Sequence, residues 1–110
     1  MRLGELYAFS RDTRTIRVGQ IGRRVRKILD PNGTIGVNTT DPLTKFFAGG
    51  NPANILPNMI NSDPAFRADF NAVNGMGISV GELRDAETVL DVITVIVDEY
   101  QDHSWNVRAG

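Results

Sequence analysis

The residues best suited to binding chemistry form one basic segment in the first third of the chain. Its five cations are Arg17, Arg23, Arg24, Arg26 and Lys27, and aliphatic residues separate them. Lysine and arginine neutralise the phosphates of nucleic acids, and the planar guanidinium group makes paired contacts with phosphate and carboxylate alike. The segment therefore predicts contact with a nucleic acid or with an acidic protein surface, while a merely solvated face is the third interpretation.

The charge of the chain is divided between its two ends. Residues 1–30 hold eight cations against three acids, a net charge of +5, and residues 31–110 hold four cations against ten acids, a net charge of −6. This asymmetry indicates a nucleic acid or a complementary protein surface as the partner. We predict an oligomer interface at four carboxylates near the C-terminal end: Glu87, Asp91, Asp98 and Asp102.

Few residues could carry catalysis. Asp102, His103 and Ser104 are the residue types of a hydrolytic triad, but neighbours in sequence cannot converge on one another as a triad requires. Glu99 and His103 stand four residues apart and would supply only two metal ligands, and the chain has no cysteine. The glycines of residues 75–81 do not match the spacing of a dinucleotide-binding loop. We therefore expect no enzyme, no catalytic residue, no metal and no cofactor.

The first third of the chain predicts a β-meander over residues 4–38. Residues 5–10 and 13–18 have the composition of short strands, and residues 34–38 favour a third strand. Residues 30–33, Asp-Pro-Asn-Gly, are typical of a hairpin turn with Gly33 in the left-handed conformation. Residues 21–29 allow a helix as well as a strand. The strand-like composition of residues 34–38, after the turn, favours a strand at residues 21–29.

Proline pairs mark the starts of short helices in the middle of the chain. Asp or Asn precedes proline at residues 41–42, 51–52 and 63–64. Asp and Asn are favoured N-caps, and proline is favoured at the first helical position. Each of these three pairs therefore predicts a helix start.

The last third predicts one long amphipathic helix over residues 80–102. Ser79 and Glu82 have the spacing of a capping box. The apolar stripe that follows has helical spacing and consists of Leu83, Ala86, Leu90, Ile93, Val97 and Tyr100, and Val89 and Ile96 widen it. Residues 89–97 are rich in β-branched side chains, which leaves a buried strand as the alternative. The whole chain, residues 1–110, is expected to form a single α+β domain.

These patterns favour a non-enzymatic structural or assembly subunit. We expect a homo-oligomer, or docking to other protein subunits in a larger complex such as a viral or phage particle. The alternative is a small nucleic-acid-binding or regulatory protein that uses residues 17–27. The first residues lack the apolar run of a signal peptide, and no window is long and apolar enough for a membrane span. A cytoplasmic location, or one inside an assembled particle, is therefore expected, with no membrane partner.

Overall fold

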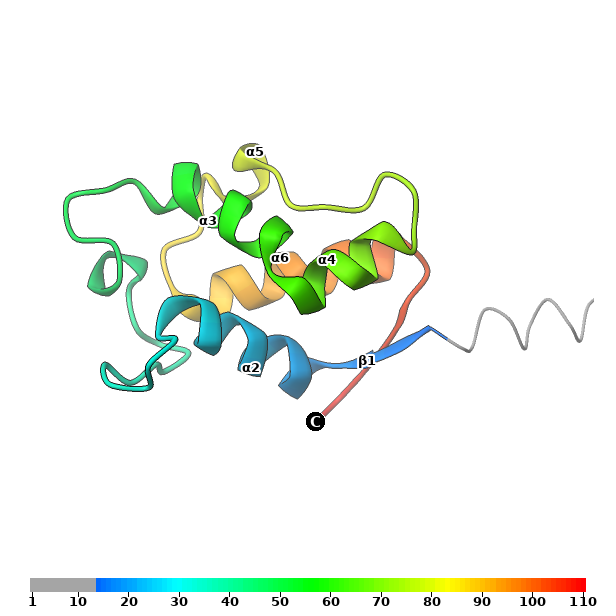
Figure 1. Cartoon of the computed structure of the whole chain (residues 1–110), viewed down its shortest axis with the longest axis horizontal. Helices are drawn as coiled ribbons and strands as arrows, with labels where there is room; N and C mark the ends of the chain where they lie inside the picture. Colours follow the sequence, from blue (N-terminus) through cyan, green and yellow to red (C-terminus); the bar gives the residue numbers. More distant parts are fainter. Residues whose placement is uncertain (1–13) are drawn as a thin grey trace, which may run out of the picture.

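A computed structural model describes residues 14–110, which form a small α+β fold with five α-helices and a two-stranded parallel sheet (Figure 1). The predicted strand at residues 5–10 lies outside the described residues. The elements in chain order are β1 (Thr15–Arg17), α2 (Val18–Leu29), the 3-10 turn η1 (Leu43–Lys45), α3 (Pro52–Ser62), α4 (Pro64–Asn71), α5 (Val80–Leu83), α6 (Val89–Asp102) and β2 (Asn106–Arg108).

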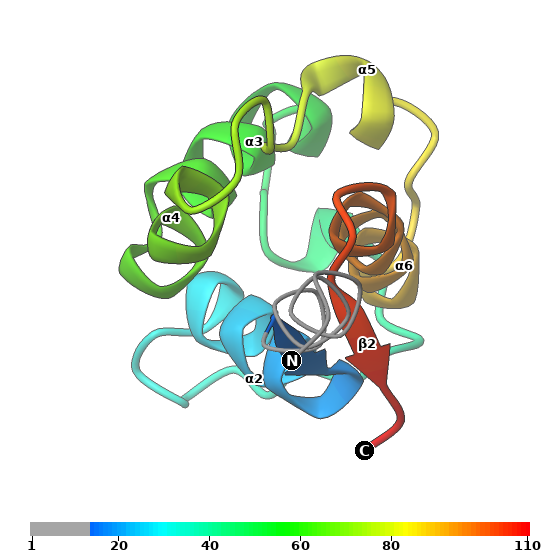
Figure 2. The ribbon, with the colours of Figure 1, turned by 90° about the vertical axis from the view of Figure 1, so that its right-hand side faces the viewer.

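The helices surround one hydrophobic core. Figure 2 shows α2, α4, α3, α5 and α6 arranged in a ring, with the short sheet beside α2 and α6. Side chains from all five helices meet inside this ring and are removed from water, which is the main favourable term in folding. The most deeply buried are Ile21 and Val25 of α2, Leu56 and Ile60 of α3, Phe66 of α4, Leu83 of α5, and Val92, Ile96 and Tyr100 of α6.

The predicted meander is wrong for residues 18–38. Residues 18–29 form the helix α2, and Ile21, Val25 and Leu29 point into the core. These residues recur every four positions, which places them on one side of a helix and equally on one face of a strand, so their spacing does not distinguish the two. Packing of α2 against α6 therefore decides in favour of the helix, which the sequence pattern alone left open.

The expected hairpin is replaced by a loop that Asp30 holds together. The Asp30 carboxylate accepts hydrogen bonds from the backbone N–H groups of Thr34, Ile35 and Gly36 at 2.9–3.1 Å. These bonds, led by the one from Gly36, hold the pKa of Asp30 below its ordinary value. Because the carboxylate uses these N–H groups, residues 34–36 form no strand. Gly33 has the predicted left-handed conformation, with φ +68°.

The sheet joins the two ends of the described chain. Strand β1 confirms the strand expected near residues 13–18, but its partner is β2, in parallel register with Ile16 opposite Val107. The Asn106 N–H also donates to the Arg14 carbonyl at 2.8 Å. The sheet therefore joins residues that are about 90 positions apart in the sequence. No local turn pattern predicts such a pairing.

The prediction of one long C-terminal helix is also wrong, because residues 84–88 separate it into two helices. The Ser79–Glu82 capping box is present and begins α5, which ends at Leu83. A second capping box, between Thr88 and Asp91, begins α6. Between the two helices, the Glu87 carbonyl accepts from Leu43 N–H at 2.9 Å, a bond that takes the backbone out of the helical pattern. The alternative of a strand at residues 89–97 is wrong as well, since these residues lie in α6.

The buried side of α6 agrees with the predicted stripe at Ile93, Ile96 and Tyr100 but not at Leu90. Val92, which was not predicted, is buried as well, whereas Leu90 is 51 % exposed. The Leu90 N–H donates to the Thr39 carbonyl at 2.9 Å. The helix therefore starts with Leu90 turned toward solvent beside the loop that precedes η1.

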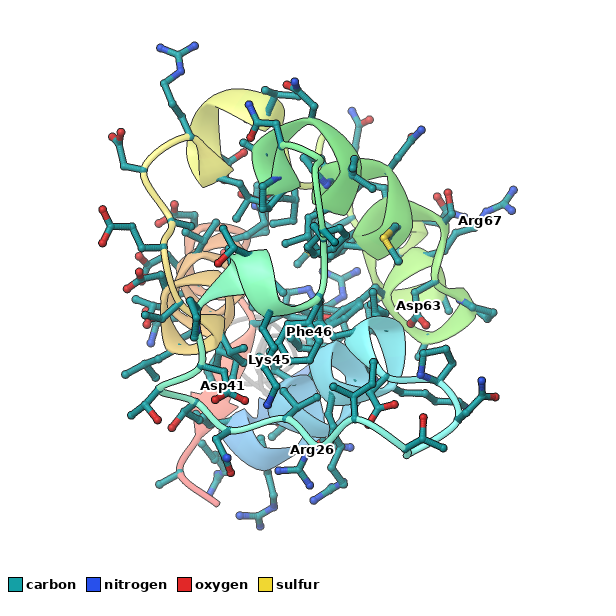
Figure 3. All side chains as sticks on the ribbon, turned by 90° about the vertical axis from the view of Figure 1, so that its left-hand side faces the viewer. Arg26, Asp41, Lys45, Phe46, Asp63 and Arg67 are labelled. Carbon is teal, nitrogen blue, oxygen red and sulfur yellow. The ribbon has the colours of Figure 1, made fainter. Side chains whose placement is uncertain are left out.

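Two of the three helix starts predicted from proline pairs are confirmed. The side chain of Asn51 accepts from Ala53 N–H at the start of α3, and that of Asp63 accepts from Phe66 N–H at the start of α4. Helix α3 continues through Pro57. Asp41 caps no α-helix, since only the 3-10 turn η1 follows it; its carboxylate accepts from Asn38 N–H and pairs with Lys45, both at 2.9 Å (Figure 3).

Replacement of Gly33 by valine should lower the free energy of unfolding by more than about 1 kcal/mol, because a β-branched residue resists a positive φ. No atom lies within 4 Å of a Cβ added at Gly33, so the cost comes from the backbone and not from a clash. Asparagine tolerates the left-handed conformation, and Gly33→Asn should cost clearly less. Urea unfolding measures both variants, and equal costs would contradict the backbone explanation.

Shortening a side chain on the buried side of α6 should lower the stability of the protein much more than shortening one on the exposed side. Ile96 is fully buried, and Ile96→Ala should cost about 2–5 kcal/mol. Leu90→Ala should change stability by no more than about 0.5 kcal/mol, as for other exposed positions. A thermal melt in which Leu90→Ala is the more damaging change would show that the helix faces the core with its other side.

Candidate functional site

The five predicted cations of the basic segment have different surroundings in the structure. Arg24 is half-buried between helices, and Arg17 is exposed but bonded to the C-terminal residues. Arg23, Arg26 and Lys27 are exposed on α2. The structure therefore separates the segment into two cations with intramolecular partners and three that face solvent.

Arg24 belongs to a hydrogen-bonded network that joins three helices. Its Nη1 lies 2.8 Å from Oδ2 of Asp69 in α4 and 3.2 Å from the hydroxyl oxygen of Tyr100 in α6. The Tyr100 hydroxyl donates to the same Asp69 oxygen at 2.6 Å. Burial, and next the bond to Asp69, raise the pKa of Tyr100 well above its ordinary value. The guanidinium also lies over the Phe66 ring at 5.2 Å.

Arg17 contributes to the closure of the two chain ends. Its Nη1 donates to the Ala109 carbonyl at 3.1 Å, and its backbone N–H donates to Gln20 at the start of α2. Gly19 lies so close to Gly110 that a Cβ there would collide with the Gly110 carbonyl. Arg17 therefore holds the C-terminal residues against the first turn of α2.

The remaining three cations, Arg23, Arg26 and Lys27, form what we call the basic ridge. They project from the outward side of α2, where Figure 3 shows Arg26 pointing away from the core. Within residues 14–110, none of the three side chains makes a hydrogen bond or an ion pair. Three neighbouring positive charges without ion pairs attract an anionic partner.

Grooves adjoin the basic ridge. The first, of about 440 Å³, lies between α2 and α6 and is lined by Gly22, Arg23 and Arg26 on one side and by Leu90 and Ile93 on the other. A second, of about 820 Å³, lies between the three ridge cations and the loop of residues 30–38. A third, of about 280 Å³, adjoins the start of α4. The ridge therefore combines charge with concave surface, and in the first groove with apolar surface.

The predicted acidic interface residues lie at the start of α6 and along its outward side. Glu87, Asp98 and Asp102 are exposed and form no ion pair with residues 14–110; we call them the acidic face. Asp91 is half-buried because it caps α6, accepting from the N–H groups of Glu87 and Thr88 at 2.9 and 3.0 Å. These bonds, first that of Glu87, hold the pKa of Asp91 below its ordinary value. The Asp91 carboxylate thus remains ionised, but it is already used in hydrogen bonds to the start of α6.

The triad residue types of the tail do not converge. His103 Nδ1 lies 3.0 Å from the Glu99 carbonyl and 3.5 Å from the Glu99 carboxylate, and no bond joins it to Asp102 or Ser104. Glu99 itself accepts from Gly77 N–H at 2.8 Å. In the part of the chain that the structure describes, no three potential ligands gather as a metal site, and no helix is long and apolar enough to cross a membrane.

Sequence reasoning missed the partners of Arg24 and the groove beside the basic ridge. Asp69 and Tyr100 lie 45 and 76 residues after Arg24, and no spacing rule connects such distant positions. Leu90 was expected in the core but lines the groove. The chain matches no protein-family model, no curated protein and no solved structure.

Removal of the Tyr100 hydroxyl should lower the free energy of unfolding and change how this free energy depends on pH. Tyr100→Phe keeps the buried ring and removes one donor to Asp69, at a cost of about 1–3 kcal/mol. In the wild-type protein, the unfolded tyrosine loses its proton above about pH 10 while the folded one keeps it, so stability falls by up to about 1.4 kcal/mol per pH unit.

The Tyr100→Phe variant should lack this part of the alkaline loss. Urea unfolding of both proteins between about pH 8 and pH 11 tests the difference. Parallel stability curves across this range would contradict the assignment of the raised pKa to Tyr100.

Proposed function

We propose that this chain is a non-enzymatic assembly subunit that docks to an acidic protein surface through the basic ridge. The observation that carries the proposal is the state of the three ridge cations, which form no ion pair with residues 14–110 and adjoin a partly apolar groove. Arg24, by contrast, already has its carboxylate within the subunit. The ridge is thus the part of the basic segment available to a partner.

The lining of the grooves favours a protein over a single-stranded nucleic acid. Proteins that bind single strands combine cations with aromatic side chains on which the bases stack. None of the three grooves along the ridge is lined by an aromatic residue. Phe66 and Tyr100 are buried. Aliphatic side chains beside arginines suit a partner that presents carboxylates and apolar groups together.

Nucleic-acid binding remains the second candidate because of the same three cations. A duplex offers phosphates without any need for stacking, and arginine and lysine on a helix can follow its backbone. This candidate predicts a steep loss of affinity with salt and no contribution from the apolar groove.

A direct comparison of two probes tests the proposal. One probe is a fluorescent amphipathic peptide with glutamate on one side of its helix and leucine on the other; the second is a DNA duplex. Fluorescence anisotropy at about 0.05 M and about 0.3 M salt should show tighter binding of the peptide, with a salt dependence set by screening. Tighter binding of the duplex at both salt concentrations would favour the second candidate.

Charge reversal locates the interaction. The triple variant Arg23→Glu, Arg26→Glu and Lys27→Glu should weaken peptide binding by at least about tenfold. The matched control reverses three exposed cations outside α2, namely Arg67, Arg84 and Arg108. It changes the net charge equally and should leave binding nearly unchanged. Equal losses in both variants would show a non-specific effect of net charge.

A further inference from the structure

We propose that the acidic partner is a second copy of this chain, bound as a two-fold dimer in which each basic ridge meets the acidic face of the other copy. This inference rests on the proposed function and goes beyond it by naming the partner and the geometry. It follows from the way α2 and α6 lie side by side (Figures 1 and 2), with opposite charges on their outward sides and an apolar strip between them.

The apolar strip is the groove between the two helices. Val18 of α2 and Leu90 of α6 are large aliphatic residues that remain 38 % and 51 % exposed, and both line this groove. The two helices are close at Gly22, where an added Cβ would lie in ordinary contact with Ile93, at 3.9 Å. Exposed aliphatic side chains that gather in one groove mark a binding surface more often than scattered ones do.

Charged residues flank the groove on both sides, and Arg23 and Arg26 of the ridge themselves line it. On α6, Leu90, Thr94 and Asp98 follow one another at four-residue spacing, so the exposed side passes from apolar to acidic. On α2, Gly22 and Arg26 stand at the same spacing beside the groove, and the ridge continues outward to Lys27. The surface therefore carries a positive stripe and a negative stripe on opposite sides of an apolar centre.

Such a surface is complementary to itself. A two-fold axis that lies in this surface, midway between the basic ridge and the acidic face and perpendicular to the line that joins them, turns one copy over onto the other. It places the ridge of each copy against the acidic face of its partner and brings the two apolar strips together at the centre. Every charge contact then occurs twice, as in any isologous interface. The contact also closes, whereas one ridge docking on one acidic face without the two-fold axis would leave free ends and lead to longer assemblies.

The strength of this dimer should depend on salt. Exposed ion pairs are each weak, and salt screens them over about 10 Å at 0.1 M ionic strength. Dimerisation should therefore be measurable at low salt and weaken by at least about tenfold in dissociation constant when the salt concentration is raised to about 0.5 M.

Reciprocal charge reversal is the decisive experiment, measured by sedimentation equilibrium on the full chain. One variant reverses the ridge, with Arg23→Glu, Arg26→Glu and Lys27→Glu. The other reverses the acidic face, with Glu87→Lys, Asp98→Lys and Asp102→Lys. Each variant alone should be monomeric, and an equimolar mixture should form a one-to-one dimer. Asp91 is left unchanged because it caps α6. Circular dichroism melts must show that both variants fold.

The outcomes separate the two proposals. A wild-type chain that is monomeric at low salt but still binds the acidic peptide would overturn the dimer and leave the proposed function intact. Loss of both activities would overturn both. Mixed variants that stay monomeric would exclude ridge-to-face pairing, and assemblies that grow beyond a dimer with concentration would exclude the two-fold geometry. Leu90→Ser should weaken the dimer without lowering the melting temperature, and an unchanged dimer would exclude the groove as its centre.

Discussion

The two hydrogen bonds that the Asp69 carboxylate accepts, from Arg24 and from Tyr100, join the three helices on which the rest of the structure is arranged. Asp69 belongs to α4, Arg24 to α2 and Tyr100 to α6. A buried carboxylate is costly unless its charge is paired and its oxygens are bonded. The rings of Phe66, Phe70 and Trp105 pack around Tyr100, with centroids 5.0–6.4 Å from its own. The network therefore permits only a narrow range of orientations for each helix.

This constraint also determines which charges reach the surface. With Arg24 turned inward, the helical repeat places Arg23, Arg26 and Lys27 on the outward side of α2. With Tyr100 turned inward, Leu90 and Asp98 face out from α6. The interior and the proposed docking surface are thus two consequences of the same helix rotations, and a variant that disturbs the network should be expected to disturb the surface.

Several predictions that rest on neighbouring residues are confirmed, although the helix start at Asp41 and the hairpin at residues 30–33 are not. The caps at Asn51 and Asp63, the capping box at Ser79 and the positive φ of Gly33 each depend on bonds or steric limits within a few residues. The other wrong predictions concern elements whose outcome depends on a distant partner. The α2 segment is apolar on one side as a helix and acceptable as a strand, so only its contact with α6 decides between them.

The sequence by itself determined the division of charge, the starts of α3, α4 and α5, and the left-handed turn after Asp30. Only the tertiary structure decided the break at residues 84–88, the exposed position of Leu90 on α6 and the parallel pairing of β1 with β2. It alone also distinguished Arg24, which has a half-buried carboxylate partner, from the three exposed cations beside it. The physical reason is that caps and turns bond within a few residues of themselves. The rotation of a helix and the partner of a strand depend on the burial and bonding of side chains that come together only when the chain folds.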